Sequence, residues 1–396
     1  MSRYGRRREP YVPGKERLEV SQENVTLRLL ALGAALLAAA LSFGYAINNM
    51  LQAPNGWQTV EAGNSKTGIT QQFTLTYNIG ADGRNATKER KAVSAIYTQS
   101  LDHAYRVLSN REDSQYTGLA ALNASPNQEI TVDPLLYAAF RTVEETGTRQ
   151  PYFAPLFEHY NSLFTADSDE SAAEWDPELT ESVGEYVREL AAYANDPAMV
   201  QVTLLPENRV RLDVSEEYLA YAKENELNTF VDFGYLLNAF LCDAAADALA
   251  ENGYTGGILS SFDGYARALC GDELAVSLYD LEENGTIVRT GEAVYHGPAA
   301  LVVCRSFPLN SQDQSNYHCY ADGTIRAPYI GRDGLLRAAA SSLTALDRQG
   351  SAATLALKAT EAFAAETLEE DLLEGISYIV TDHGEIRTTG SDFSLR

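Results

Sequence analysis

Two stretches decide how this chain folds: Asp232-Phe-Gly-Tyr-Leu-Leu-Asn-Ala-Phe-Leu-Cys-Asp243 and Gly257-Ile-Leu-Ser-Ser-Phe-Asp-Gly264. An alanine-rich segment separates them. Apolar residues recur at three- and four-residue steps through 236–252 and stop at Gly253, which predicts a helix with one buried face. The short apolar run after Gly253 predicts a strand. Glycine and polar residues therefore gather at two places, the start of the helix and the end of the strand.

This block resembles the flavin-holding signature of the ApbE family, the FAD:protein FMN transferases. In that signature Asp-Leu-Gly-Gly-x-x-Lys-Gly-x-x-x-Asp opens a helix and Asn-x-Gly-Gly ends the next strand. Asp232, Gly234 and Asp243 match the first motif, whereas Tyr235 stands at its second glycine. Asn238 stands at its lysine, so a positive charge expected near the phosphates is missing.

The second motif and two further stretches extend the resemblance to about residues 70–390. Ser261-Phe-Asp263-Gly264 replaces Asn-x-Gly-Gly, which introduces a carboxylate where the ligand would approach. Ser114 and Asn123 are in register with a Ser-Glu-Ile-x-x-Leu-Asn stretch of the family. In the C-terminal third, Ala353 stands at an aspartate that supplies a metal ligand in the family.

The resemblance implies an α+β, ApbE-like single catalytic-type domain over residues 71–396, with FAD as substrate and Mg²⁺ as cofactor. The implied reaction is attack of a threonine hydroxyl of a flavin-acceptor protein on the FMN phosphorus of FAD, with AMP leaving. His318 is the expected general base, although a structural role weighs equally. The residues expected at the cofactor are Ser114, Asn123, Asp232, Gly234, Asn238, Asp243, Ser261, Asp263 and Gly264.

Two interpretations stay open. In the first, the chain is an active, divergent transferase whose metal is held by Asp263, Asp322 or backbone carbonyls. In the second, it is a catalytically silent surface module that binds flavin or a partner protein with the same fold. An aspartate at position 263 repels an anion in one view and holds magnesium in the other.

The N-terminal region predicts a membrane anchor. Residues 29–47 are uncharged and rich in Leu and Ala, and 19 residues of helix are about as long as a hydrocarbon core is thick. Arginines crowd residues 1–28, so the positive-inside rule predicts a cytoplasmic tail there and an extracytoplasmic domain, in a single-pass protein of the cell membrane. A cleaved signal peptide and a core helix are the alternatives. Residues 48–70, polar and aperiodic, predict a linker.

Charge and cysteine spacing exclude other classes. The formal net charge of -25 would repel a phosphate backbone, so no nucleic-acid partner is expected. The four cysteines lack any C-x-x-C spacing. A Cys304–Cys319 disulfide is compatible with an extracytoplasmic domain, whereas Cys242 on the apolar helix side is expected to be buried. The acidic run within 165–187 lacks the calcium-loop pattern and predicts a solvated loop.

Several other elements are expected from periodicity and caps. A strand is predicted at 72–78 and a helix at 92–109. A helix capped by Asp133, opened by Pro134 and ended at Gly147 is predicted next. Residues 200–205 and 209–213 predict a hairpin, and Asp213 then predicts the cap of a further helix.

Overall fold

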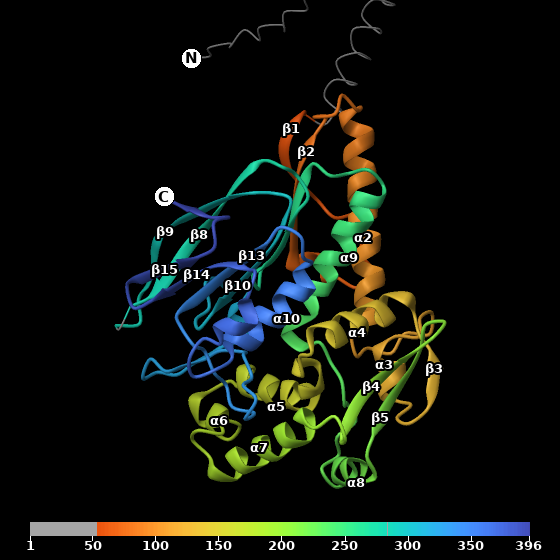
Figure 1. Cartoon of the computed structure of the whole chain (residues 1–396), viewed down its shortest axis with the longest axis vertical. Coiled ribbons are helices and arrows are strands. Elements are labelled where there is room, and N and C mark those ends of the chain that lie inside the picture. Colours follow the sequence, from red (N-terminus) through yellow and green to blue (C-terminus); the bar gives the residue numbers. More distant parts are fainter. Residues whose placement is uncertain (1–53, 283) are drawn as a thin grey trace, which may run out of the picture. The chain divides into compact units, whose positions relative to one another are not determined.

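An eight-stranded antiparallel sheet forms the centre of the computed structural model, which describes residues 54–282 and 284–396 (Figure 1). In spatial order its strands are β1 (Gly56–Val60), β2 (Phe73–Ile79), β6 (Gly257–Ser261), β7 (Tyr265–Ala268), β10 (Ala299–Arg305), β13 (Ser342–Asp347), β14 (Ser377–Asp382) and β15 (Glu385–Thr389). Every second residue of β2 is buried, because side chains alternate between the two faces of a strand.

Three helices cover one face of this sheet. They are α2 (Ala86–Leu108), α9 (Leu237–Glu251) and α10 (Ala352–Phe363). Helix α9 packs between the other two and lies against β6 and β7, while α10 lies against β10 and β13. Asn85 caps α2 by accepting from the Lys88 amide at 3.0 Å, and Ser351 caps α10.

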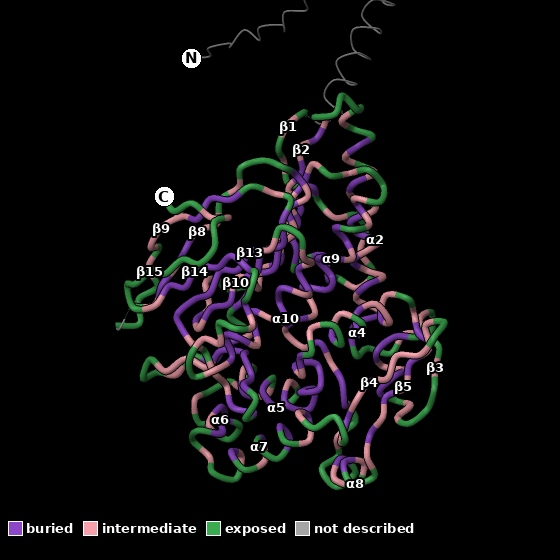
Figure 2. The backbone as a smooth tube through the Cα atoms, viewed as in Figure 1, coloured by how far each residue is buried: buried purple, intermediate pink, exposed green. Residues whose placement is uncertain are grey.

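A second, three-stranded sheet covers the opposite face. It has the order β16 (Ser394–Leu395), β9 (Ile287–His296) and β8 (Glu273–Leu281). Tyr295 packs with Leu301 and Leu346 of the main sheet in one apolar cluster. Leu301 alternates with the helix-facing Val302, so β10 is buried on both faces, and the centre of the main sheet is purple in Figure 2.

A helical lobe joins the sheet at the end where α9 begins (Figure 1). Its helices are α3 (Leu119–Asn123), α4 (Pro134–Thr146), α5 (Ala154–Phe164), α6 (Asp169–Ala173), α7 (Glu181–Asn195) and α8 (Glu216–Glu224). A small sheet of β3 (Glu129–Thr131), β5 (Arg209–Val214) and β4 (Val200–Leu205) lies beside them. Single turns of 3₁₀ helix, η1 (Ile69–Gln72), η2 (Gln150–Phe153), η3 (Gly234–Leu236), η4 (Gln314–Asn316) and η5 (Glu370–Leu373), and the β11 (His318–Cys319) and β12 (Ile325–Arg326) pair complete the described elements.

Most elements that the periodicity predicts are confirmed. Helix α4 begins at Pro134, with the Asp133 carboxylate accepting from the Leu135 amide at 2.9 Å, and ends at Gly147 in a left-handed conformation. Helix α9, strands β2 and β6 and the β4–β5 hairpin also form at the expected residues. Cys242 is fully buried, as expected.

Other expectations were wrong. Residues 56–60 of the expected linker form β1, because Val60 has a buried position on the sheet and pairs with Leu75. Ser215, not Asp213, caps α8, since its hydroxyl accepts from the Tyr218 amide at 3.0 Å.

The acidic run is also not a simple solvated loop. Asp176 is fully buried, where its carboxylate accepts hydrogen bonds from Arg326 at 2.7 Å and Tyr320 at 3.0 Å. The four cysteines are free thiols, and Cys304 is buried whereas Cys319 is exposed.

Within the described residues, no helix is both long and apolar enough to cross a membrane. The span predicted at residues 29–47 lies outside those residues.

Candidate functional site

The helix start and strand end that the sequence singles out meet at a polar cavity of about 350 Å³, here called the polar cleft. Asn238, in the first turn of α9, and Asp263, in the turn between β6 and β7, both line it. The remaining lining residues are Gln71, Gln72, Phe262, Gln312, Asp313, Ser315 and Asn316. Side-chain amides therefore dominate this cavity.

A second cavity of about 220 Å³, the aromatic cleft, adjoins the first. The two share Ser315 and Asn316 as lining residues. The aromatic cleft is otherwise lined by Phe157, Tyr160, Asn161, Phe164, Gly234, Tyr235, Pro328 and Ile330. The two clefts together offer an apolar, ring-lined half beside a hydrogen-bonding half, which is the usual composition of a small-molecule site.

Asn238 and Asp263 are hydrogen-bonded to each other. The Asn238 amide Nδ2 donates to Asp263 Oδ2 at 2.8 Å and to Gln72 Oε1 at 2.9 Å. Asp263 Oδ1 is buried and has no hydrogen-bond partner within the described residues. Burial raises the pKa of the Asp263 carboxyl above its usual value, against the opposing effect of the nearby Ser261 hydroxyl and the Asn238 amide.

Arg305, a cation whose charge acts on Asp263, is already paired with a carboxylate. The Arg305 guanidinium lies 2.6 Å from Asp313 Oδ2, and both side chains are buried. Asp313 also accepts from the Leu309 and Asn310 amides, at 3.1 and 2.9 Å. The positive charge of Arg305 is thus balanced by a carboxylate before it can act on a ligand in the polar cleft.

Asp232 and Gly234 build the turn that leads into α9. The Asp232 Oδ1 atom accepts from the Gly234 amide at 2.9 Å, and burial raises the pKa of this carboxyl. Gly234 has φ +51°, and a Cβ there would lie 2.6 Å from the Phe157 ring. Only glycine therefore fits both the left-handed backbone and the close approach of Phe157.

Asp243 connects three elements inside the helix layer. Its carboxylate accepts from Arg267 of β7, from the Ala352 amide at 2.9 Å and from the Ala353 amide at 2.7 Å. The last two belong to the first turn of α10, where a negative charge is favourable because the helix dipole is positive. Asp243 is therefore engaged by other parts of the chain.

Ser261 and Gly264 shape the turn that carries Asp263. The Ser261 hydroxyl accepts from the Tyr265 amide at 3.1 Å. Gly264 has φ +106°, and a Cβ there would lie 2.3 Å from the carbonyl oxygen of Val303 in the neighbouring strand β10. These two residues therefore hold the β6–β7 turn against β10.

One loop, residues 306–330 between β10 and β13, supplies Ser315 and Asn316 to both clefts. Asp313 fastens it to Arg305, the last residue of β10. His318 Nε2 lies 3.3 Å from Asp169 Oδ1 at the start of α6. Arg326 binds Asp176 at 2.7 Å. These polar contacts fix the wall that the two clefts share.

Comparison with known proteins identifies this architecture. No family model and no curated protein matches the sequence. The ApbE protein of Thermotoga maritima matches 85% of this chain and 97% of its own, with a TM-score of 0.57 and 14% identity. The flavin transferase ApbE of Vibrio cholerae matches 85% of this chain and 98% of its own, with a TM-score of 0.56 and 14% identity.

A third match is the apo flavinyl transferase ApbE of Pseudomonas stutzeri, which covers 85% of this chain and 94% of its own, with a TM-score of 0.52 and 13% identity. The chain has the ApbE fold. At these identities the comparisons establish the fold, so the chemistry of the clefts has to be argued from the residues present.

The ApbE fold brings only part of the predicted site together. Asn238 and Asp263 line the polar cleft, and Gly234 lines the aromatic cleft. Asp232, Asp243, Ser261 and Gly264 line neither cleft and stabilise the neighbouring backbone. Asn123 is buried, where its side chain accepts from the Phe230 amide at 2.9 Å and donates to the Val231 carbonyl at 2.8 Å. It therefore positions the chain entering Asp232.

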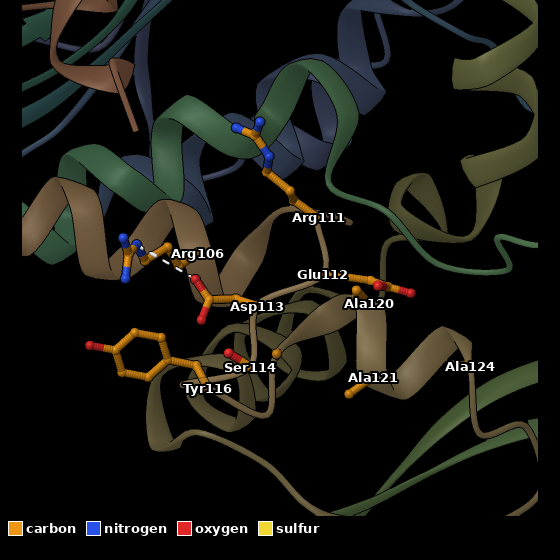
Figure 3. A pocket seen from close by; sticks show the side chains of 10 residues that line it. Arg106, Arg111, Glu112, Asp113, Ser114, Tyr116, Ala120, Ala121 and Ala124 are labelled. Atoms are coloured by element: carbon orange, nitrogen blue, oxygen red, sulfur yellow. Dashed lines mark ion pairs between the residues drawn. The ribbon is translucent and has the colours of Figure 1, made fainter. Parts of the chain in front are cut away.

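Ser114 lies in a different cavity of about 310 Å³, between the end of α2 and α3 (Figure 3). Figure 3 shows Asp113 turned toward Arg106, with which it forms an ion pair of 3.6 Å, while Ser114 is exposed. This cavity shares no lining residue with the polar or aromatic cleft. His318, the expected base, lines neither cleft.

The magnesium ion that the ApbE fold implies does not fit the residues present. In the described ranges, no group of three or more His, Cys, Asp or Glu side chains could hold a metal ion. Asp243 is fully engaged, and Asp322 accepts from the Thr324 amide at 2.8 Å in an exposed turn. Among the described residues that line the polar cleft, only Asp263 has a free carboxylate oxygen, and that oxygen is buried.

Sequence reasoning missed residues that shape the clefts. The sequence indicates only a lost glycine at Tyr235, yet its hydroxyl donates to Gln150 Oε1 at 2.8 Å and its ring lies 5.3 Å from the Phe157 ring, edge to face. Gln72, Gln312 and Asp313 were also missed. Gln72 is the first residue of the predicted strand, and Gln312 and Asp313 lie in a loop with no periodic pattern, so only the resemblance at position 235 offered a signal.

Proposed function

We propose that this protein binds a flavin in the adjoining aromatic and polar clefts without transferring FMN to an acceptor. We infer flavin as the ligand from the fold, since the similar solved structures include flavin transferases. The aromatic cleft has the apolar lining that a planar ring system requires. The observation that carries the proposal is the Asn238–Asp263 hydrogen bond. It holds a carboxylate beside Asn238, the residue that stands where the transferase signature has a lysine.

Transfer of FMN from FAD depends on cations that neutralise charge on the reacting phosphate. The polar cleft offers none, since its lining in the described structure contains no Lys, Arg or His and Arg305 is paired with Asp313. Loss of one preorganised electrostatic contact typically lowers kcat by about 10²- to 10³-fold. The absence of the signature lysine at position 238 and, among the described residues, of a fitting metal site together favours a silent module over an enzyme.

The location of this module is inferred from the N-terminal residues. The apolar segment 29–47 and the arginines before it support a single-pass anchor in the cell membrane, with the flavin-binding domain outside the cytoplasm. In this arrangement the protein would present a bound flavin at the membrane surface to an extracytoplasmic partner.

An active, divergent FAD:protein FMN transferase is the second function to test. It is favoured by the names of the similar structures, two of which are flavin or flavinyl transferases that this chain covers almost completely. Such an enzyme would use FAD and Mg²⁺, release AMP and modify a threonine of an acceptor protein.

The experiment uses the full chain in detergent micelles with MgCl₂, incubated with FAD or, in parallel, with riboflavin, each with and without a threonine-bearing acceptor peptide. Flavin that stays with the protein on gel filtration is measured by absorbance, and AMP by ion-pair chromatography. We expect flavin retention without AMP and without labelled peptide. AMP release coupled to peptide labelling would establish the enzyme instead. Retention of neither FAD nor riboflavin would refute both functions. Ser114→Ala, remote from the clefts, serves as the matched control.

A further inference from the structure

The polar cleft is the part of the molecule whose chemistry the proposed function leaves open, because flavins differ mainly in the group at the end of the ribityl chain. Riboflavin ends in a neutral polyol, FMN in a phosphate and FAD in a pyrophosphate with an adenosine. A phosphate accepts hydrogen bonds and carries negative charge, whereas a hydroxyl both donates and accepts. The donors and acceptors of the cleft therefore discriminate among the three.

The start of α9 offers few free donors. The Gly234 amide donates to Asp232, the Leu236 amide to the Phe233 carbonyl at 2.9 Å, and the Leu237 amide to the Gly234 carbonyl. A helix N-terminus binds phosphate through unpaired amides, and here the amides of Gly234, Leu236 and Leu237 are already paired. The backbone at this helix start is therefore poorly suited to a pyrophosphate.

The Asn238 side chain offers no free donor either. An asparagine amide has two N–H bonds, and Asn238 donates one to Gln72 and the other to Asp263. Only its carbonyl oxygen is left to face a ligand. Where a lysine would supply a positive charge, the first turn of α9 thus presents an acceptor.

The remaining lining is neutral or acidic. The side chains of Gln71, Gln312, Ser315 and Asn316 make no hydrogen bond within the described part of the chain, so each has both donor and acceptor capacity available. Asp263 adds an unpartnered acceptor and negative charge, whereas the charge of Asp313 is balanced by Arg305. The amides and the hydroxyl are complementary to hydroxyl groups, and the Asp263 carboxylate repels a phosphate.

We propose that the adjoining clefts select a flavin without phosphate, with the isoalloxazine ring in the aromatic cleft and the neutral polyol chain among the amides of the polar cleft. This preference rests on the proposed flavin binding and goes beyond it, since it names riboflavin-type ligands over FMN and FAD. It is the reverse of the preference that a transferase of FMN from FAD needs.

The test is a fluorescence titration of the full chain in detergent with riboflavin, FMN and FAD, at neutral pH and low salt. We expect the Kd for riboflavin to be at least about tenfold lower than that for FMN or FAD, which corresponds to about 1.4 kcal/mol. Added salt should narrow the ratio because it screens the repulsion of the phosphates.

Two substitutions test the cause. Asp263→Asn keeps the shape of the side chain and removes its charge, so the ratio of the FAD to the riboflavin Kd should fall several-fold. Asn238→Lys restores a cation and should lower the ratio further, and its folding is checked by circular dichroism against Asp263→Asn. Ser114→Ala should leave the ratio unchanged.

The outcomes separate the two proposals. Binding of none of the three flavins would refute the proposed function itself. Binding of FAD or FMN as tightly as riboflavin, or a ratio that Asp263→Asn leaves unmoved, would overturn the selectivity while leaving flavin binding intact.

Discussion

Asp243 provides the sharpest distinction between a ligand-binding and a structural carboxylate. Its side chain accepts hydrogen bonds from Arg267, Ala352 and Ala353 and is buried. The variant Asp243→Asn would leave the Arg267 guanidinium, 17% exposed, without its main charge partner. Breaking a buried ion pair by removing one partner typically costs about 3 to 5 kcal/mol of unfolding free energy. The amide that replaces one oxygen would also face the N–H groups of α10.

Urea unfolding followed by circular dichroism measures this loss. With a slope of about 3 kcal/mol per molar urea, a loss of about 3 kcal/mol lowers the midpoint by about 1 M. The matched control is Asp247→Asn, one turn further along α9, where the carboxylate is 61% exposed and 3.4 Å from the same arginine. An exposed pair contributes about 0 to 1 kcal/mol, so its midpoint should hardly move.

A loss below about 1 kcal/mol for Asp243→Asn would refute the structural assignment. The structural assignment would also be refuted if Asp243→Asn unfolds at the same urea concentration as the parent but no longer binds flavin, because Asp243 would then act on the ligand.

Three further outcomes are expected. Gly234→Ala should lower the unfolding free energy by about 2 to 4 kcal/mol, because of left-handed strain and overlap with Phe157. The control Gly375→Ala, also at positive φ but with open space around it, should cost about 1 to 2 kcal/mol. Equal urea midpoints of the two variants would contradict the contact with Phe157. Burial raises the folded-state pKa of Asp263 above 3.8, so Asp263 loses its proton at a higher pH in the folded state than in the unfolded state. The unfolding free energy therefore falls as pH rises past 3.8. Asp263→Asn lacks that loss and should become more stable than the parent toward neutral pH, with the difference smallest below 3.8, as thermal melts across pH would reveal. Asp313→Asn should cost about 3 to 5 kcal/mol because it leaves a buried arginine unpaired, and an unchanged melting temperature would speak against that pair.

Local signals predicted the elements that depend on near neighbours. The Asp133 cap, Pro134 and Gly147 together fix both ends of α4 within one short stretch, and the alternation of β2 reflects burial on one face. Strand β1 was missed because an edge strand needs few apolar residues, and only Val60 of its five residues is buried.

The predicted site stays a prediction, and the structure adds contacts among its residues that the sequence does not indicate. The resemblance marks 238 and 263 as departures from the ApbE signature and treats them as two separate losses. In the folded chain the two residues are 2.8 Å apart and bind each other, which no spacing of 25 residues along the sequence reveals. The same limit applies to Asp176 and Arg326, which are 150 positions apart and form a buried pair.

The polar contacts that hold residues 306–330 have a consequence for how a ligand enters. Because Asp313, His318 and Arg326 connect this loop to β10, to α6 and to the segment after α6, its shape is set before any ligand arrives. Capture should then proceed in one kinetic step, with an observed rate that rises linearly with ligand concentration and shows no plateau from a slow rearrangement.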